Sequence, residues 1–330
     1  MAQPNGPRIE SSSVIRAMNQ PTLWRSRRSF LRWVTGSAMA AGAGWPAIGI
    51  ASDGREPRRK PIPSSGEKIP VIGMGTWITF NVQEDPEALA VRTRILDTFV
   101  RRGGGLIDSS PMYGRAEAVV GHGLRELGHP EGVFSATKIW TRSTSTGRDQ
   151  HAESRDLWGV DTLDLQQVHN LQNWEAHLET LRERREAGEV RYLGVTTSHA
   201  RRHDELERIL RREDLDFVQL TYNILDREAE QRLLPLARER GVAVIANRPF
   251  RRKALINQFA GHPLPEWAAE IECENWPQFL LKFIVSHPDV TCAIPATSVV
   301  AHMEENMGAL YGPMPDAGMR SRMVAYVQDL

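Results

Sequence analysis

The sequence has few cysteines and no excess of charge of either sign, and each of these shortages argues against a class of protein. Only two cysteines occur among 330 residues, Cys273 and Cys292, and they lie far apart without the spacing of a metal site. We expect both to be buried packing residues. Lysine plus arginine equals aspartate plus glutamate at 41 each, so nothing indicates a nucleic-acid partner.

Neither a complete set of metal ligands nor a glycine-rich nucleotide motif is found. His199 and His203 lie four residues apart, a spacing that can bind a metal on one helix face, but no third ligand accompanies them. No G-x-G-x-x-G sequence follows the first expected strand, so a dinucleotide cannot be bound as in a Rossmann fold. We therefore expect no metal, and a nucleotide would have to be bound in another way.

The N-terminal segment lacks the continuous large aliphatic residues of a membrane helix. Its uncharged stretch, 33–51, is interrupted by glycines and by Pro46. Consecutive arginines, Arg27 and Arg28, precede this stretch, and small residues at 49–51 offer a cleavage point. We predict a twin-arginine (Tat) signal peptide over residues 1–51, export to the periplasm by the Tat machinery, and no permanent membrane anchor. A disordered basic tail is the alternative.

Charged residues and prolines dominate the next segment, as in Asp53–Pro61. This composition is typical of an extended connection between folded parts. We therefore expect a linker over residues 52–67 and a single folded domain over residues 68–330.

Short apolar runs alternate with longer amphipathic stretches from Ile69 onward, which is the rhythm of βα units. Eight pairs can be counted, with strands expected at 71–74, 106–109, 134–139, 163–169, 192–196, 217–222, 242–246 and 292–295, and helices at 85–102, 116–127, 149–157, 174–187, 203–212, 228–240, 278–286 and 301–310. Val242–Ala246 is apolar on both faces, as a parallel strand between other layers should be. The pattern fits an α/β (β/α)8 TIM barrel, and a doubly wound sheet has a similar rhythm.

Polar side chains stand where successive strands are expected to end, and this favours the barrel. Asp108, Lys138 and His169 occupy the ends of the second, third and fourth strands. Each of them alone has an ordinary structural explanation, such as a helix cap or a solvated strand end. In a TIM barrel, however, all strand ends of this kind share one rim, where active sites are found. We expect these three residues and Tyr113 to converge there.

Several motifs, in the correct order, resemble those of the aldo/keto reductase superfamily. They are Gly73–Trp77, Leu106–Gly114, Thr137-Lys138, Leu163–Asn170 and Gly188–Val195. The resemblance implies a barrel oxidoreductase that exchanges hydride between a nicotinamide cofactor and a small-molecule carbonyl or alcohol. It also implies a catalytic set of Asp108, Tyr113, Lys138 and His169.

The chemistry of these four side chains agrees with that implication. A carbonyl that has received hydride needs a proton, and a free phenol with a pKa of about 10 is a weak donor near neutral pH. We expect Lys138 to lower the pKa of Tyr113, and Asp108 to keep Lys138 charged. His169 can orient the substrate oxygen.

The resemblance further implies where the cofactor binds. Thr196, Thr197 and Gln219 would lie at the carboxamide. From charge and position, and not from the resemblance, we expect Arg248, Arg251 or Arg252 to hold the pyrophosphate. The whole expected set is Thr76, Trp77, Asp108, Thr196, Thr197, Gln219, Arg248, Thr297, His302 and Asn306. Ala296 stands where many members have Lys or Gly, and His302 stands where an Arg is usual. NADP(H) is therefore expected, and NAD(H) stays possible. Asn247–Phe250 stands where many members place an aromatic that stacks on the nicotinamide.

Apolar residues after the strand ends suggest the substrate wall. Trp77, Met112, Trp140 and Phe250 could enclose a small apolar carbonyl compound.

A barrel that binds nicotinamide nucleotide without catalysis, as a sensor or assembly subunit, is the alternative function. The complete catalytic set argues for the enzyme.

Overall fold

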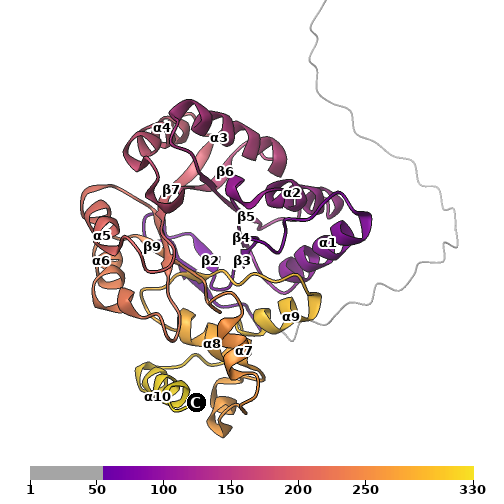
Figure 1. The fold of residues 1–330 in the computed structure, drawn as a ribbon, viewed down its shortest axis with the longest axis vertical. Coiled ribbons are helices and arrows are strands. Elements are labelled where there is room, and N and C mark those ends of the chain that lie inside the picture. The colour runs from indigo at the N-terminus through magenta and orange to yellow at the C-terminus, as the bar shows by residue number, and fades with distance from the viewer. Residues whose placement is uncertain (1–54) are drawn as a thin grey trace, which may run out of the picture. The chain divides into compact units, whose positions relative to one another are not determined.

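A computed structural model of the protein describes residues 55–330 (Figure 1). The predicted signal peptide, residues 1–51, lies outside the described residues, as do the first three residues of the predicted linker. Within the described part of the chain, no helix combines the length and the apolar character that a membrane crossing requires.

Eight parallel strands form the centre of the fold. In sheet order they are β3 (Met74–Gly75), β4 (Leu106–Asp108), β5 (Phe134–Ile139), β6 (Leu163–Val168), β7 (Val190–Thr196), β8 (Phe217–Thr221), β9 (Ala243–Asn247) and β10 (Cys292–Ala293). Each pairs with its neighbour in sequence, and parallel bridges from Ile72 to Ala293 and from Gly75 to Ala296 join the two edges. The predicted (β/α)8 barrel is therefore confirmed.

Helices surround this barrel, as Figure 1 shows. They are α1 (Pro86–Arg101), α2 (Ala116–Glu126), α3 (Thr144–Trp158), α4 (Trp174–Glu186), α5 (His203–Arg212), α6 (Leu233–Glu239), α8 (Trp276–Val285) and α9 (Val300–Gly308), with α7 (Ala254–Phe259) and α10 (Ala317–Gln328) added. Most begin and end within three residues of the prediction. Helix α3 begins five residues earlier than expected, because the side chain of Ser143 caps it by accepting a hydrogen bond from Thr146 N.

The barrel interior and the layer between strands and helices hold two separate cores. Alternate residues of each strand point inward, and near the amino ends of the strands they include Phe134, Tyr192 and Phe217, whose rings lie about 6 Å apart. Cys273 and Cys292 are both buried and unbonded, as expected. The interior is thus filled below the rim where the polar strand ends gather.

The folded domain begins earlier than the sequence indicates. Within the predicted linker, β1 (Arg59–Pro61) pairs antiparallel with β2 (Lys68–Pro70), and Ile62 between them is fully buried in the inner core. Lys60 Nζ donates hydrogen bonds of 2.6 Å to the carbonyl oxygens of His287 and Val290. Lys60 can be partly buried because these two carbonyl oxygens accept hydrogen bonds from its ammonium group. The charged and proline-rich composition predicted a linker in this segment, whereas the chain forms a β-hairpin.

Lys60 gives a testable consequence for stability. Burial, followed by the charge of Arg320, lowers the pKa of Lys60 from 10.5 to about 8. Between these two pH values the unfolded chain holds this proton more firmly than the folded protein does, so the contribution of Lys60 to stability rises with pH. We expect the free energy of unfolding of the wild type minus that of Lys60→Met, measured by urea titration, to become more positive from pH 8 to pH 10. A difference that stays constant or shrinks would contradict this assignment.

Candidate active site

The four predicted catalytic residues lie together at the carboxyl-end rim of the barrel. Asp108 ends β4, Lys138 lies near the end of β5, and His169 follows β6 directly. Tyr113 ends a short 3-10 helix, Pro111–Tyr113, which Ser110 caps by accepting a hydrogen bond from Met112 N at 3.2 Å. Loop and strand ends therefore bring all four side chains to one side of the barrel mouth.

Lys138 and Asp108 form an ion pair in the barrel interior. Lys138 Nζ lies 2.6 Å from Asp108 Oδ2, and the two side chains are 0% and 3% exposed. Lys138 also donates to the carbonyl oxygen of Ser109 at 2.7 Å. Burial alone would lower the pKa of Lys138, but the charge of Asp108 and its hydrogen bond to the ammonium raise it above its ordinary value. The ammonium therefore keeps its charge in the folded protein.

Side-chain amides hold the other carboxylate oxygen of Asp108. Gln219 Nε2 donates to Asp108 Oδ1 at 2.8 Å, and Gln167 Nε2 lies at 3.4 Å from the same atom. Both oxygens of the buried carboxylate thus have partners, which is the condition for keeping such a charge without a large penalty. Lys138 is in consequence held at one fixed place below the rim.

Tyr113 lies against this pair. Lys138 Nζ is 5.1 Å from the centre of the phenol ring, and the ring meets His169 edge to face at 5.7 Å. Lys138 acts on the pKa of Tyr113 in the expected direction, which is downward, but the pKa does not fall below its ordinary value. Burial raises the pKa of Tyr113 by more than the charge of Lys138 lowers it. Tyr113 therefore keeps its proton at neutral pH, as a proton donor must.

His169 is a neutral side chain at the same point. Burial, with the nearby charge of Lys138, lowers the pKa of His169 well below its ordinary value. Its Nδ1 lies 3.0 Å from Ser110 Oγ. When the Ser110 hydroxyl donates to Nδ1, the ring proton is on Nε2, which is the tautomer able to donate to a ligand.

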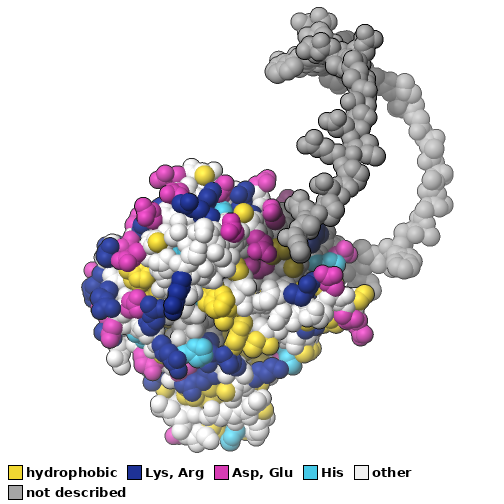
Figure 2. Space-filling view, turned by 45° about the horizontal axis from the view of Figure 1, so that its top comes forward, with side chains coloured by type: hydrophobic (Ala, Val, Ile, Leu, Met, Phe, Trp, Pro, Cys, Tyr) yellow, Lys and Arg dark blue, Asp and Glu magenta, His cyan; other side chains and the backbone are white. Residues whose placement is uncertain are grey.

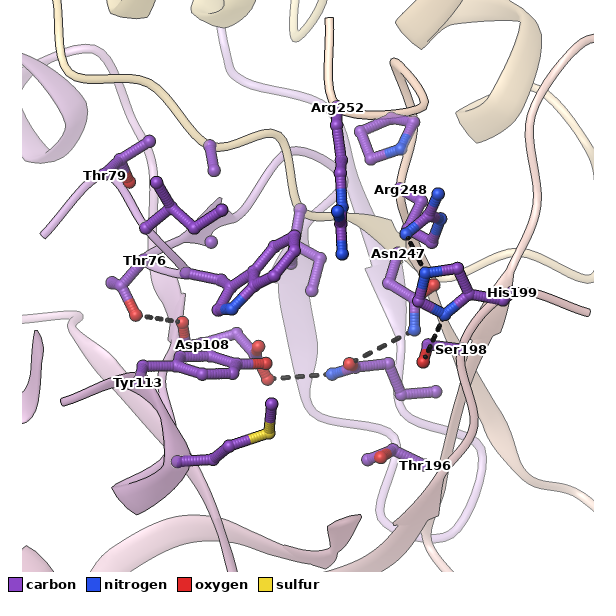
Figure 3. Close-up of a pocket in the computed structure, with 18 of the residues that line it drawn as sticks. Thr76, Thr79, Asp108, Tyr113, Thr196, Ser198, His199, Asn247, Arg248 and Arg252 are labelled. Carbon is purple, nitrogen blue, oxygen red and sulfur yellow. Dashed lines mark hydrogen bonds between the residues drawn. The ribbon is translucent and has the colours of Figure 1, made fainter. Parts of the chain in front are cut away.

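A cavity of about 370 Å³ opens over these residues (Figure 3). Seven of the ten predicted cofactor-binding residues line it: Thr76, Trp77, Asp108, Thr196, Thr197, Gln219 and Arg248. The other three do not. Thr297 and Asn306 are buried and His302 is exposed, before or on helix α9 beside the barrel mouth. Of the predicted substrate wall, Trp77, Met112 and Phe250 line the cavity, whereas Trp140 does not.

One wall of the cavity carries a polar atom that lacks a partner. Thr197 Oγ1 is buried without any hydrogen bond, although Thr196 Oγ1 beside it accepts from Asn170 N at 3.1 Å. Buried hydroxyls are nearly always hydrogen-bonded, so this unpartnered one, on a residue that lines the cavity, is a candidate contact for a ligand group. A carboxamide, which both donates and accepts, fits the pair of Thr197 and Gln219.

Basic residues also line the mouth of the cavity. The Arg252 guanidinium stacks over the Trp77 ring at 4.1 Å, and Arg248 Nη1 lies 2.6 Å from His199 Nε2. Neither Arg252 nor Lys253, which also lines the cavity, has an ion-pair partner among residues 55–330. Arg251 is different, because it binds the carboxylate of Asp226 and does not line the cavity. Apolar and basic side chains also lie side by side on the face shown in Figure 2.

Ser110, Gln167 and Asn247 make contacts at the site that were not predicted from the sequence. Gln167 had a usable signal, because the adjacent pair Gln166-Gln167 within one strand must place one amide inside the barrel. Asn247 ends β9, where its Nδ2 donates to the carbonyl oxygen of Thr197 at 2.8 Å. Within residues 55–330, no group of three or more histidine, cysteine, aspartate or glutamate side chains could hold a metal ion.

Comparison with known proteins places this geometry among relatives. A sequence model of the Aldo/keto reductase family matches residues 71–321. The chain is 24% identical to the NADH-specific methylglyoxal reductase of Escherichia coli, over 79% of this chain and 95% of that protein. It is 26% identical to the methylglyoxal reductase YeaE of the same organism, over 82% of this chain and 95% of that protein.

Solved structures give the same fold. An aldo/keto reductase from Klebsiella pneumoniae in complex with NADP and acetate has a TM-score of 0.67 at 23% identity, covering 79% of this chain and 92% of that one. The holo form of the aldo-keto reductase AKR11C1 from Bacillus halodurans has a TM-score of 0.68 at 20% identity, covering 82% and 96%.

Proposed function

The chain belongs to the aldo/keto reductase family, and from that premise we propose which of its residues reduce a carbonyl group and which hold the cofactor. It is an oxidoreductase that uses NAD(P)(H) to interconvert an aldehyde or ketone and an alcohol. The observation that carries the assignment of residues is the buried Lys138–Asp108 pair beside a protonated Tyr113. A barrel that only bound nucleotide would not need this arrangement.

Tyr113 is the proton donor in this proposal. The cofactor, when bound, supplies the hydride for reduction and accepts it for the reverse reaction. Reduction leaves negative charge on the substrate oxygen, and Tyr113 Oη gives it a proton. The phenolate that remains is stabilised by the ammonium of Lys138, which Asp108 keeps in place. His169, neutral and able to donate from Nε2, orients the same oxygen.

The residues at the mouth fit the two ends of a nicotinamide nucleotide. The unpartnered hydroxyl of Thr197 and the amide of Gln219 would hold the carboxamide. Arg248 and Arg252, with Lys253, would hold the phosphates, because their charges are not neutralised by carboxylates of the cavity wall. Thr297, His302 and Asn306 remain the predicted adenosine end. NADP(H) is the expected cofactor, with NAD(H) also possible.

The substrate is a small carbonyl compound. Trp77, Met112 and Phe250 supply an apolar wall beside Tyr113 and His169, and such walls suit short uncharged aldehydes. Methylglyoxal, the compound named for two relatives, is the natural first probe.

Tyr113→Phe tests the chemical role. We expect kcat/KM for methylglyoxal to fall by about a hundredfold to ten-thousandfold, the usual range for a lost general acid, since the ring remains but its proton donor is gone. The dissociation constant of NADPH should stay within about twofold of the wild type. Steady-state kinetics and fluorescence titration measure the two quantities.

Two variants serve as comparisons for that experiment. Tyr311→Phe removes a hydroxyl that bonds to the carbonyl oxygen of Arg102 outside the site, so turnover should be unchanged. Arg252→Met should weaken NADPH binding, which Tyr113→Phe leaves unchanged. The weakening should be largest at low salt, because a contact to a phosphate is lost. Full activity in Tyr113→Phe would remove this residue from the role of proton donor.

We also propose that residues 1–51 are a twin-arginine signal and that the protein functions in the periplasm. The supporting residues are Arg27 and Arg28 before an uncharged stretch rich in alanine and glycine. Because this route carries folded proteins, the cofactor would be loaded before export.

Replacement of both arginines by lysine tests the export proposal. Arg27→Lys with Arg28→Lys should leave the protein in the cytoplasm, whereas the wild type should appear in the periplasmic fraction on immunoblots. A variant with Arg58→Lys and Arg59→Lys, beyond the proposed signal, should be exported normally. Equal distribution of the wild type and the first variant would refute a twin-arginine signal.

A further inference from the structure

We propose that Asn247, at the end of β9, is a positioning residue that fixes the side-chain amide of Gln219 and the backbone of Thr197 for recognition of a carboxamide. The inference rests on the proposed function, because it concerns how the nicotinamide end of the cofactor is recognised. It assigns a hydrogen-bonding role to Asn247, whose segment, Asn247–Phe250, the resemblance connects only with an aromatic that stacks on the nicotinamide.

Asn247 connects the ends of three neighbouring strands. It is 9% exposed, and its Nδ2 donates to the carbonyl oxygen of Thr197 at 2.8 Å, just beyond β7. The same nitrogen lies 3.4 Å from Gln219 Oε1 on β8, a longer contact for its second hydrogen. Its Oδ1 accepts a hydrogen bond from Thr221 Oγ1 at 2.8 Å. Figure 3 shows Asn247 on the same side of the cavity as Thr196 and Ser198.

These contacts leave Gln219 with one orientation. Its Nε2 donates to Asp108 Oδ1 at 2.8 Å while its Oε1 faces the Asn247 amide group. If the amide turned over, Oε1 would face the Asp108 carboxylate and Nε2 would face Nδ2 of Asn247, so both contacts would become repulsive. Asn247 and Asp108 together therefore hold Gln219 Nε2 toward the Asp108 carboxylate and Gln219 Oε1 toward the Asn247 amide.

The fixed orientation leaves complementary groups for a ligand amide. Nε2 of Gln219 has two hydrogens, and Asp108 is its one hydrogen-bond partner among residues 55–330. Thr197 Oγ1, on the residue whose carbonyl Asn247 holds, is buried and unpartnered. A carboxamide carries both the acceptor that the second hydrogen of Gln219 Nε2 lacks and the donor that Thr197 Oγ1 lacks, so the two residues match the chemistry of this group.

The same chain of contacts reaches the proton donor. Asn247 contacts Gln219, Gln219 contacts Asp108, and Asp108 binds Lys138. Because Asp108 depends on Gln219 for one of its oxygens, the residue that orients Gln219 also helps to hold the buried ion pair. Asn247 touches none of the reacting groups itself, and it acts through its neighbours.

Asn247→Leu tests the proposal, since leucine has a similar size and no hydrogen-bonding atoms. We would measure dissociation constants for NADPH and for 2′-phospho-ADP-ribose, which carries the phosphates and lacks the nicotinamide, and likewise for NADH and ADP-ribose. We expect the intact cofactor to bind about fivefold to tenfold more weakly, roughly the effect of one to two neutral hydrogen bonds. The truncated nucleotide should bind within about twofold of the wild-type value, because its contacts are elsewhere.

Thr221→Val supplies a milder variant if Asn247→Leu does not fold, which thermal unfolding would reveal. It removes the hydrogen bond to Asn247 Oδ1 together with the one that Thr221 Oγ1 accepts from His199 N at 3.0 Å, and we expect a smaller weakening that is again greater for the intact cofactor than for the truncated nucleotide. No weakening in the variant that folds, or equal weakening for intact and truncated nucleotides, would overturn the role of Asn247. Failure of the wild type to bind any of the four nucleotides would instead overturn the proposed function, and this outcome is distinguishable because it needs no variant.

Discussion

The ion pair between Lys138 and Asp108 is the contact on which the arrangement of the site depends. Both side chains are almost completely buried, with 2.6 Å between Nζ and Oδ2. Removing one partner of such a pair leaves an uncompensated buried charge and typically costs about 3–5 kcal/mol. The surrounding amides of Gln167 and Gln219 are therefore required by the pair, and the ends of β4, β5, β6 and β8 are held in register by it. Tyr113 and His169 pack against this assembly.

Burial and charge act on Tyr113 in opposite directions, and their balance explains how a phenol serves as a proton donor here. Burial raises the pKa of Tyr113, whereas Lys138 lowers it, and burial has the larger effect. The resting side chain is thus protonated, and the ammonium becomes most valuable when negative charge develops next to it. For His169 both effects act in one direction, so that residue stays neutral and can act as a hydrogen-bond donor.

Much of the fold and the catalytic residues could be predicted from the sequence, because both follow from patterns among residues that are close together along the chain. Apolar periodicity located the strands, and polar strand ends located Asp108, Lys138 and His169, since every strand of a parallel barrel ends at one rim. Contacts between distant segments could not be predicted. Lys60 is held by carbonyls more than 200 residues away, and Arg251 is bound by Asp226 while Arg252 stacks on Trp77. Adjacent arginines look alike in a sequence, and only the loop conformation after β9 separates their roles.

The most direct test of this account is the titration of Tyr113 itself. The phenol carbon of Tyr113 can be followed by NMR in protein labelled with carbon-13 tyrosine, with Tyr113→Phe identifying its signal among the five tyrosines. The account predicts that Lys138→Met raises the pKa of Tyr113 further, because burial remains and the opposing ammonium is gone. An unchanged or lower pKa of Tyr113 in Lys138→Met would contradict the claim that the buried ion pair tunes the proton donor.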